Sequence, residues 1–205
     1  MHRVALVIDP SPALLPPLVR GLGAAGYDVA FSAPRGAVRG VSEQLRGSGR
    51  RGLALDRSME PDEVVGRVRD ELGRLDLVVV EPARAEEAPE LHGSSGGGEV
   101  YASGASAIGA ARITLELLGE THGSIVRLLR PASASDAAAL SGHDVASTRR
   151  LGRSLGARVR VNGVAIPRST KAGVATDRTA DAVVRAVLWL AGSELLNGEI
   201  VSIDR

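Results

Sequence analysis

Hydrophobic residues follow two alternating patterns along the chain. Short runs rich in Val, Leu and Ile have strand length, and most are separated by stretches in which apolar residues recur every three or four positions, as on one side of a helix. Because several runs are apolar at successive positions, they predict an α/β fold with a seven-stranded parallel sheet and helices on both faces. The expected strands are Arg3–Ile8, Tyr27–Phe31, Gly52–Leu55, Leu75–Val80, Ser124–Leu129, Val159–Ala165 and Glu199–Ile203.

Helical spacing occurs in the stretches between most of the strands. We expect one helix from Pro61, one around Ile108 to Leu118 with many small residues, one around Val145 to Leu155, and a last one capped by Asp177 or Thr179. Residues 84–100 are polar and glycine-rich, which predicts a flexible surface loop rather than a linker. The interpretation is therefore a single domain spanning residues 1–205.

Composition and charge exclude several classes of function. The 25 Lys and Arg residues nearly balance 24 Asp and Glu, so no strong overall charge points to nucleic acid or to a membrane surface. Cysteine is absent, and the four histidines show no metal-ligand spacing, so no metal site is predicted. No apolar run approaches the ~20 residues of a membrane span. We expect a cytoplasmic protein.

Two glycine-related features bear on nucleotide binding. Gly21, Gly23 and Gly26 match the G-x-G-x-x-G spacing, but they precede the second strand instead of following the first, so we interpret them as a helix end and turn. The turn that does follow the first strand contains four prolines between Asp9 and Pro17, none of which has an N–H donor. This turn is not expected to bind a dinucleotide in the usual manner.

Seven segments follow one another along nearly the whole chain: Val4–Val7, Gly26–Ala30, Leu75–Val79, Gly123–Val126, Leu151–Leu155, Arg160–Ala165 and Gly198–Val201. In this order they resemble landmarks of the short-chain dehydrogenase/reductase family. The resemblance implies a Rossmann-like, doubly wound fold. It also implies a chemistry in which NAD(P) carries hydride while a tyrosine, aided by a lysine, transfers a proton.

Carried over position by position, the functional motifs of the family are replaced. Its Asn-Asn-Ala-Gly segment falls on Val80–Ala83. The positions of its glycine turn fall on Asp9, Ala13 and Leu15, and those of its catalytic serine, tyrosine and lysine fall on Arg130, Ser141 and Val145. The Ser141 hydroxyl is a far weaker acid than the phenol of a tyrosine, and Val145 carries no charge. The resemblance therefore implies no catalytic residue and no cofactor in this chain.

Two polar residues remain as vestigial cofactor candidates. Arg35 follows the second strand, where the family can place a phosphate-binding arginine, and Asp56 follows the third, where the family often contacts adenine. Asp56 is equally a strand-end carboxylate, and Arg35 is one of 24 arginines. The segment at residues 168–178, where the family holds a substrate lid, is short.

The leading hypothesis is a catalytically inactive subunit that assembles with an active ketoreductase or dehydrogenase homologue, which would hold the NAD(P), and stabilises or shapes it. An enzyme with an unrecognised site on the same scaffold, and a homo-oligomeric binder of a small ligand, remain alternatives. Arginines from Arg149 to Arg160 form a local basic cluster, which we interpret as a solvated or partner-facing surface. The expected partner interface comprises Gly104, Ala107, Ala110, Ala111, Val145, Thr148, Gly152, Leu155 and Trp189.

Overall fold

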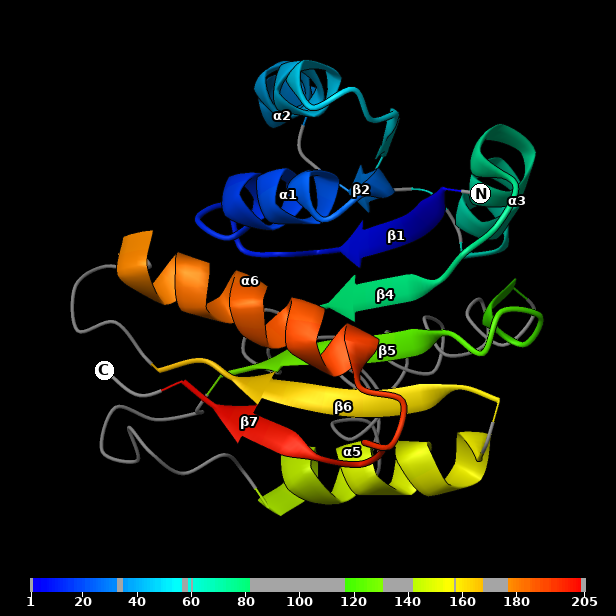
Figure 1. The fold of residues 1–205 in the computed structure, drawn as a ribbon, viewed down its shortest axis with the longest axis vertical. Helices are drawn as coiled ribbons and strands as arrows, with labels where there is room; N and C mark the ends of the chain where they lie inside the picture. The colour runs from blue at the N-terminus through cyan, green and yellow to red at the C-terminus, as the bar shows by residue number, and fades with distance from the viewer. Residues whose placement is uncertain are drawn as a thin grey trace, which may run out of the picture.

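The computed structural model describes residues 2–32, 35–56, 59, 61–81, 117–130, 142–156, 158–167 and 177–203. Its centre is a seven-stranded sheet in the order β3-β2-β1-β4-β5-β6-β7, with every neighbouring pair parallel (Figure 1). The predicted parallel sheet is confirmed, and each strand lies close to its expected bounds. The strands are β1 (Arg3–Ile8), β2 (Tyr27–Ser32), β3 (Gly52–Leu55), β4 (Leu77–Val80), β5 (Ser124–Leu129), β6 (Arg160–Ala165) and β7 (Ile200–Ser202).

Helices cover both faces of the sheet (Figure 1). One apolar cluster joins the sheet to α1 (Leu15–Ala24), α2 (Arg35–Gly47) and α6 (Asp177–Gly192). A second cluster joins the opposite face to α3 (Pro61–Leu72) and α5 (Gly142–Leu155). The helix expected around Ile108 to Leu118 lies mostly outside the described residues, as do the loop at 84–100 and most of the 168–178 segment.

Strand β1 shows why both faces carry a core. Ala5 and Val7 belong to the first cluster, whereas Val4 and Leu6 belong to the second, because successive side chains of a strand point to opposite faces. All four residues are at most 1% exposed. A strand buried on both sides reads as a continuous apolar run, which is the pattern that predicted the sheet.

The three glycines with dinucleotide-like spacing serve packing and a turn. A Cβ on Gly21 would lie 2.3 Å from Val184 Cγ1, and one on Gly23 would lie 3.0 Å from Leu45 Cδ2, so these glycines let α6 and α2 pack closely against α1. Gly26 follows the helix with φ +92°, a conformation that a side chain would disfavour. The interpretation as a helix end and turn is therefore confirmed.

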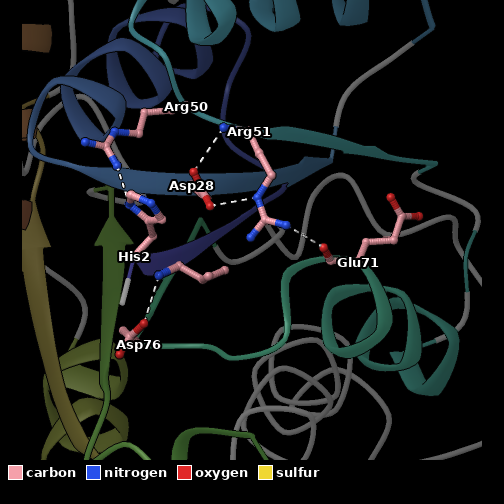
Figure 2. Close-up of polar contacts among 7 residues, drawn as sticks. His2, Asp28, Arg50, Arg51, Glu71 and Asp76 are labelled. Atoms are coloured by element: carbon pink, nitrogen blue, oxygen red, sulfur yellow. Dashed lines mark hydrogen bonds and ion pairs between the residues drawn. The ribbon is translucent and has the colours of Figure 1, made fainter.

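Polar contacts tie the strands together at the amino edge of the sheet (Figure 2). The Asp28 carboxylate, at the start of β2, accepts hydrogen bonds from the backbone N–H of Arg51 at 3.0 Å and from its Nε at 2.9 Å. The Arg51 guanidinium also donates to the Glu71 carbonyl oxygen, and Asp76 accepts from the Val4 N–H at 2.8 Å. These contacts hold β2 to β3 and β1 to β4 at the edge opposite the strand carboxyl ends.

Candidate functional site

The strand order reverses direction between β1 and β4, and ligands of doubly wound folds bind at the carboxyl ends beside such a reversal. Three segments leave the sheet here: the turn with Asp9 and Ser11 after β1, Glu81 after β4, and Arg130 after β5. We therefore take this edge as the candidate functional site and ask what its side chains could bind.

An ion pair and two hydrogen bonds join these three segments. Arg130 Nε lies 2.5 Å from Glu81 Oε1, and Arg130 Nη2 donates to Ser11 Oγ at 2.7 Å. The second carboxylate oxygen of Glu81 accepts the Ser11 backbone N–H at 2.8 Å. The side chains of Arg130 and Glu81 are only 12% and 13% exposed. We call Ser11, Glu81 and Arg130 the switch-point network.

The first turn of α1 offers no backbone donor to an anion. The N–H groups of Leu14 and Leu15 both donate to the Ser11 carbonyl oxygen, at 2.9 and 3.2 Å. Pro16 and Pro17 have no N–H, and the N–H of Leu18 makes the first intrahelical bond, to the Leu14 oxygen. A phosphate at a helix N-terminus needs free amides of this turn, and here each one is bonded or absent.

The other residues that the resemblance places at the glycine turn are Asp9, Ala13 and Leu15. Asp9 is exposed, has φ 47°, and its backbone N–H donates to Ser32 Oγ at 2.8 Å. Ala13 is half-buried, whereas Leu15 packs into the core of the sheet and is only 3% exposed. The segment between β1 and α1 thus contains no glycine, and the N–H groups of Asp9 and Ser11 both donate to side chains, those of Ser32 and Glu81.

Two predicted cofactor candidates lie at the same edge of the sheet, on the β2–β3 side. Asp56 is exposed and directly follows β3, and its carbonyl oxygen accepts the N–H of Met59. Arg35 is the first residue of α2, and its side chain lies outside the described part. The described contacts do not join either residue to the switch-point network.

The replaced catalytic positions separate in the structure. Arg130 belongs to the switch-point network, Val145 lies half-buried in the first turns of α5, and Ser141 lies outside the described residues. Arg130 and Glu81, the latter within Val80–Ala83, both lie at positions of replaced family motifs, but their pairing was not predicted. Their opposite charges, placed directly after two adjacent strands, were the signal that could have revealed it.

A buried arginine that sequence reasoning missed lies within β5. Arg127 is 4% exposed, and its Nη1 donates to Ser147 Oγ and Thr148 Oγ1, both at 2.7 Å. Both hydroxyls donate onward to the Asp144 carbonyl oxygen. Burial lowers the pKa of the Arg127 guanidinium, and the nearby Asp144 charge opposes that effect. Arg127 thereby fixes the first turns of α5 against the sheet.

Several residues of the expected partner interface pack against the chain itself. Thr148 is fully buried on Arg127, and a Cβ on Gly152 would lie 2.7 Å from Asn197 Oδ1. Leu155 packs on the second core cluster. Trp189, near the end of α6, is 56% exposed, and Gly104, Ala107, Ala110 and Ala111 lie outside the described residues.

These features define an α/β protein with a doubly wound parallel sheet, and solved structures give the particular fold. The chain aligns over 98% of its length with 96% of a short-chain dehydrogenase from Burkholderia cenocepacia in complex with NADP, at 24% identity and TM-score 0.73. It also aligns over 98% of its length with 96% of a double mutant of the Serratia marcescens short-chain dehydrogenase/reductase, at 20% identity and TM-score 0.74. An NADH-dependent reductase complexed with NAD gives TM-score 0.76 at 12% identity, covering 95% of that chain.

The protein therefore has the fold of the short-chain dehydrogenase/reductases. No protein-family profile matches its sequence, and no curated protein does. Within the described ranges, no helix is long and apolar enough to cross a membrane.

Proposed function

We propose that this chain is a catalytically inactive subunit with the short-chain dehydrogenase/reductase fold, which assembles with an active ketoreductase or dehydrogenase and stabilises or shapes that partner. The observation that carries the proposal is the switch-point network. The carboxyl edge at which a doubly wound fold would bind its nucleotide is instead joined by the chain's own Ser11, Glu81 and Arg130.

Electrostatics and hydrogen bonding both support the absence of a cofactor from this chain. A pyrophosphate placed beside β1 would meet the exposed Asp9, a charge of its own sign, and the Glu81–Arg130 ion pair, in which Glu81 already balances the charge of Arg130. To bind the Ser11 N–H it would have to displace the Glu81 carboxylate, with which it would compete for both Ser11 and Arg130. Solved neighbours of the same fold were captured with NADP and with NAD, so the scaffold itself does not prevent binding.

The surface near the end of α6 supports assembly. Trp189 is 56% exposed and Leu195 is 98% exposed, and both are large apolar side chains close in sequence to the edge strand β7. Among the strands of the described residues, β7 pairs with β6 alone, so its outer backbone groups have no partner strand there. The NAD(P) of the proposed complex would belong to the partner.

Calorimetric titration of the purified chain with NADH and with NADPH tests the first half of the proposal. We expect no binding at physiological cofactor concentrations, because the α1 turn has no free donor. An active reductase of the same fold is the positive control. Binding in the micromolar range would contradict the proposal and would make Arg35 and Asp56 the first residues to replace.

Co-expression with a reductase of this fold encoded beside it, followed by size-exclusion chromatography, tests the second half. We expect one complex that contains both chains and reduces its substrate with NAD(P)H. The double substitution Trp189→Glu/Leu195→Glu should abolish the complex while leaving the fold intact, since both side chains are exposed. Arg20→Gln/Arg46→Gln makes the same change in charge at exposed positions on α1 and α2 and should have no effect.

A chain that elutes as a monomer, alone and beside every co-encoded reductase, would refute the assembly role. The homo-oligomeric small-ligand binder would then become the better explanation.

A further inference from the structure

The chain contains two asparagines, and a glycine directly follows each of them. Asn162 and Gly163 lie in β6, whereas Asn197 and Gly198 precede the strand β7 at the border of the sheet (Figure 1). An asparagine loses its side-chain amide most readily before a glycine, because the unhindered and flexible glycine backbone can reach the asparagine Cγ. Hydrogen bonds join the two dipeptide segments to each other, so their surroundings can be compared directly.

Hydrogen bonds hold the Asn197 amide at both ends. Its Oδ1 accepts the Val161 backbone N–H at 2.9 Å, and its Nδ2 donates to the Gly152 carbonyl oxygen at 3.0 Å. The N–H of Gly198 donates to the Val161 carbonyl oxygen at 2.7 Å. Asn197 is nevertheless exposed. It therefore joins α5, β6 and the segment before β7 from a position that water can reach.

Asn162 makes reciprocal contacts from inside the sheet. Its Oδ1 accepts the Glu199 N–H and its Nδ2 donates to the Leu196 carbonyl oxygen, both at 3.0 Å. The N–H of Gly163 donates to the Glu199 carbonyl oxygen at 2.8 Å. Asn162 is fully buried, and its strand pairs with β5 as well as with β7. The same dipeptide thus occurs once within the sheet and once at its border.

The closed arrangement protects both dipeptides from amide loss. The reaction begins when the glycine nitrogen gives up its proton and attacks the asparagine Cγ, which requires the backbone to rotate. At Asn197, the proton of Gly198 is engaged by the Val161 oxygen, and the side chain cannot turn without breaking two hydrogen bonds. The reaction therefore requires the segment to open locally.

Local opening frees Asn197 more easily than Asn162. Strand β7 has only three residues, none of which is fully buried, and within the described part of the chain it pairs with β6 alone. Release of β7 and the segment before it breaks every Asn197 contact given above. Asn162 would stay in a strand that is still paired with β5 along its whole length, from Arg160 to Ala165.

We propose that Asn197 is a deamidation site whose reaction is controlled by the opening of β7. In the open state, the deprotonated Gly198 nitrogen forms a bond to Asn197 Cγ, and the bond from Cγ to Nδ2 breaks. Ammonia leaves, taking up a proton in place of the one lost by Gly198, and a cyclic imide remains. Water then adds to either carbonyl of the imide, which yields an aspartate or an isoaspartate.

The product would hold β7 less well than the amide does. A carboxylate at this position can still accept the Val161 N–H, but it has no donor for the Gly152 carbonyl oxygen and would place a charged oxygen towards it. An isoaspartate also adds an atom to the backbone, which shifts Gly198 relative to Val161. We therefore expect deamidation to loosen the edge of the sheet irreversibly.

The test uses the full chain without cofactor or partner, so its outcome is independent of the proposed function. Samples are kept in mildly alkaline buffer, with or without enough urea to unfold the chain, and peptide mass spectrometry follows the conversion of amide to acid. In urea, Asn162 and Asn197 should convert at similar rates, since a glycine follows each. In the folded chain both should be slower, and Asn197 should convert at least about tenfold faster than Asn162.

Two matched substitutions test the role of opening. Val201→Ala removes two methyl groups from a partly buried side chain of β7, and Val64→Ala removes the same groups from a partly buried side chain of α3. Val201→Ala should accelerate the conversion of Asn197 about threefold or more, because less apolar contact holds the edge strand. Val64→Ala should leave that rate unchanged.

Asn197→Asp reproduces one product and tests its consequence. Amide hydrogen exchange in residues 199–203 should be about threefold or more faster than in the wild type. Leu195→Asp introduces the same charge two residues earlier, on a side chain that is 98% exposed, and should exchange like the wild type.

Three results would overturn the inference. The first is an Asn197 that stays unmodified in the folded chain after both asparagines have converted in urea. The second is equal conversion of Asn162 and Asn197 in the folded chain, or equal acceleration by the two valine substitutions, since either would assign the reaction to global unfolding. The third is wild-type hydrogen exchange in Asn197→Asp, which would show that the modification leaves β7 unchanged.

Discussion

The ion pair between Glu81 and Arg130 should contribute strongly to stability because of its burial. In the single variant Arg130→Met, the Glu81 carboxylate would keep only the Ser11 N–H as a partner in a site where it is 13% exposed. Removing one member of a buried pair costs ~3–5 kcal/mol, and the slight exposure favours the lower value. A loss of about 3 kcal/mol would lower the melting temperature by about 6–12 °C in a chain of this length.

A double-mutant cycle separates the interaction from the cost of each substitution. Glu81→Gln keeps an oxygen that can accept the Ser11 N–H but removes the charge. The double variant Glu81→Gln/Arg130→Met should therefore be more stable than the sum of the two single losses predicts, by at least ~1.5 kcal/mol. Urea unfolding followed by far-UV circular dichroism measures all four proteins.

The chain offers a matched control with similar geometry and different burial. Arg67 Nη2 lies 2.5 Å from Glu71 Oε1 on α3, the same distance as in the buried pair, but the side chains are 45% and 48% exposed. The cycle with Arg67→Met and Glu71→Gln should give a coupling of only ~0.3–0.5 kcal/mol. Equal couplings in the two cycles, or additive losses at Glu81 and Arg130, would refute the reasoning that burial makes the switch-point network strong.

Two further predictions concern the replaced catalytic positions and acid stability. Ser141→Tyr with Val145→Lys should give no reductase activity with NADPH and a panel of ketones, because the first turn of α1 still has no free backbone donor. Turnover above that of the wild type would show that this turn can accept the cofactor. Burial by itself would raise the pKa of Asp28, but the hydrogen bonds and the positive charge of Arg51 outweigh burial and lower that pKa. The ionised carboxylate therefore stabilises the fold above about pH 4, and this contribution to stability is lost as the pH falls further. Asp28→Asn should therefore cost roughly 1.5–3 kcal/mol near neutral pH and flatten the loss of stability below pH 4. Parallel acid titration curves for variant and wild type would contradict this.

The sheet could be predicted from the sequence because its signal is local. Strand β4 reads Leu-Val-Val-Val, and such a run can pack only where both faces are covered. The glycines of α1 could also be interpreted correctly, since their position relative to the first two strands excluded a phosphate-binding turn. In contrast, the packing that requires Gly21 depends on Val184, far along the chain, and no local pattern predicts that contact.

The sequence shows directly that the prolines after β1 carry no N–H, but the contacts that form at the candidate site could not be predicted from it. The pairing of Glu81 with Arg130 joins residues 49 positions apart, and it depends on how far each chain segment continues beyond its strand. The burial of Thr148 and Gly152 on α5 depends in the same way on contacts with Arg127 and Asn197, which lie in other segments of the chain.

Under the proposed function, the switch-point network also restricts how this sequence could change towards one that binds a nucleotide. Replacing Arg130 by serine leaves a nearly buried carboxylate at Glu81, and replacing Glu81 first leaves a nearly buried guanidinium at Arg130. Either first substitution lowers the stability of the fold before any nucleotide binding is gained, and the prolines of α1 would still provide no N–H donor. Wherever stability is under selection, each single substitution would therefore be selected against. The Glu81–Arg130 pair would then be retained even without any selection against cofactor binding.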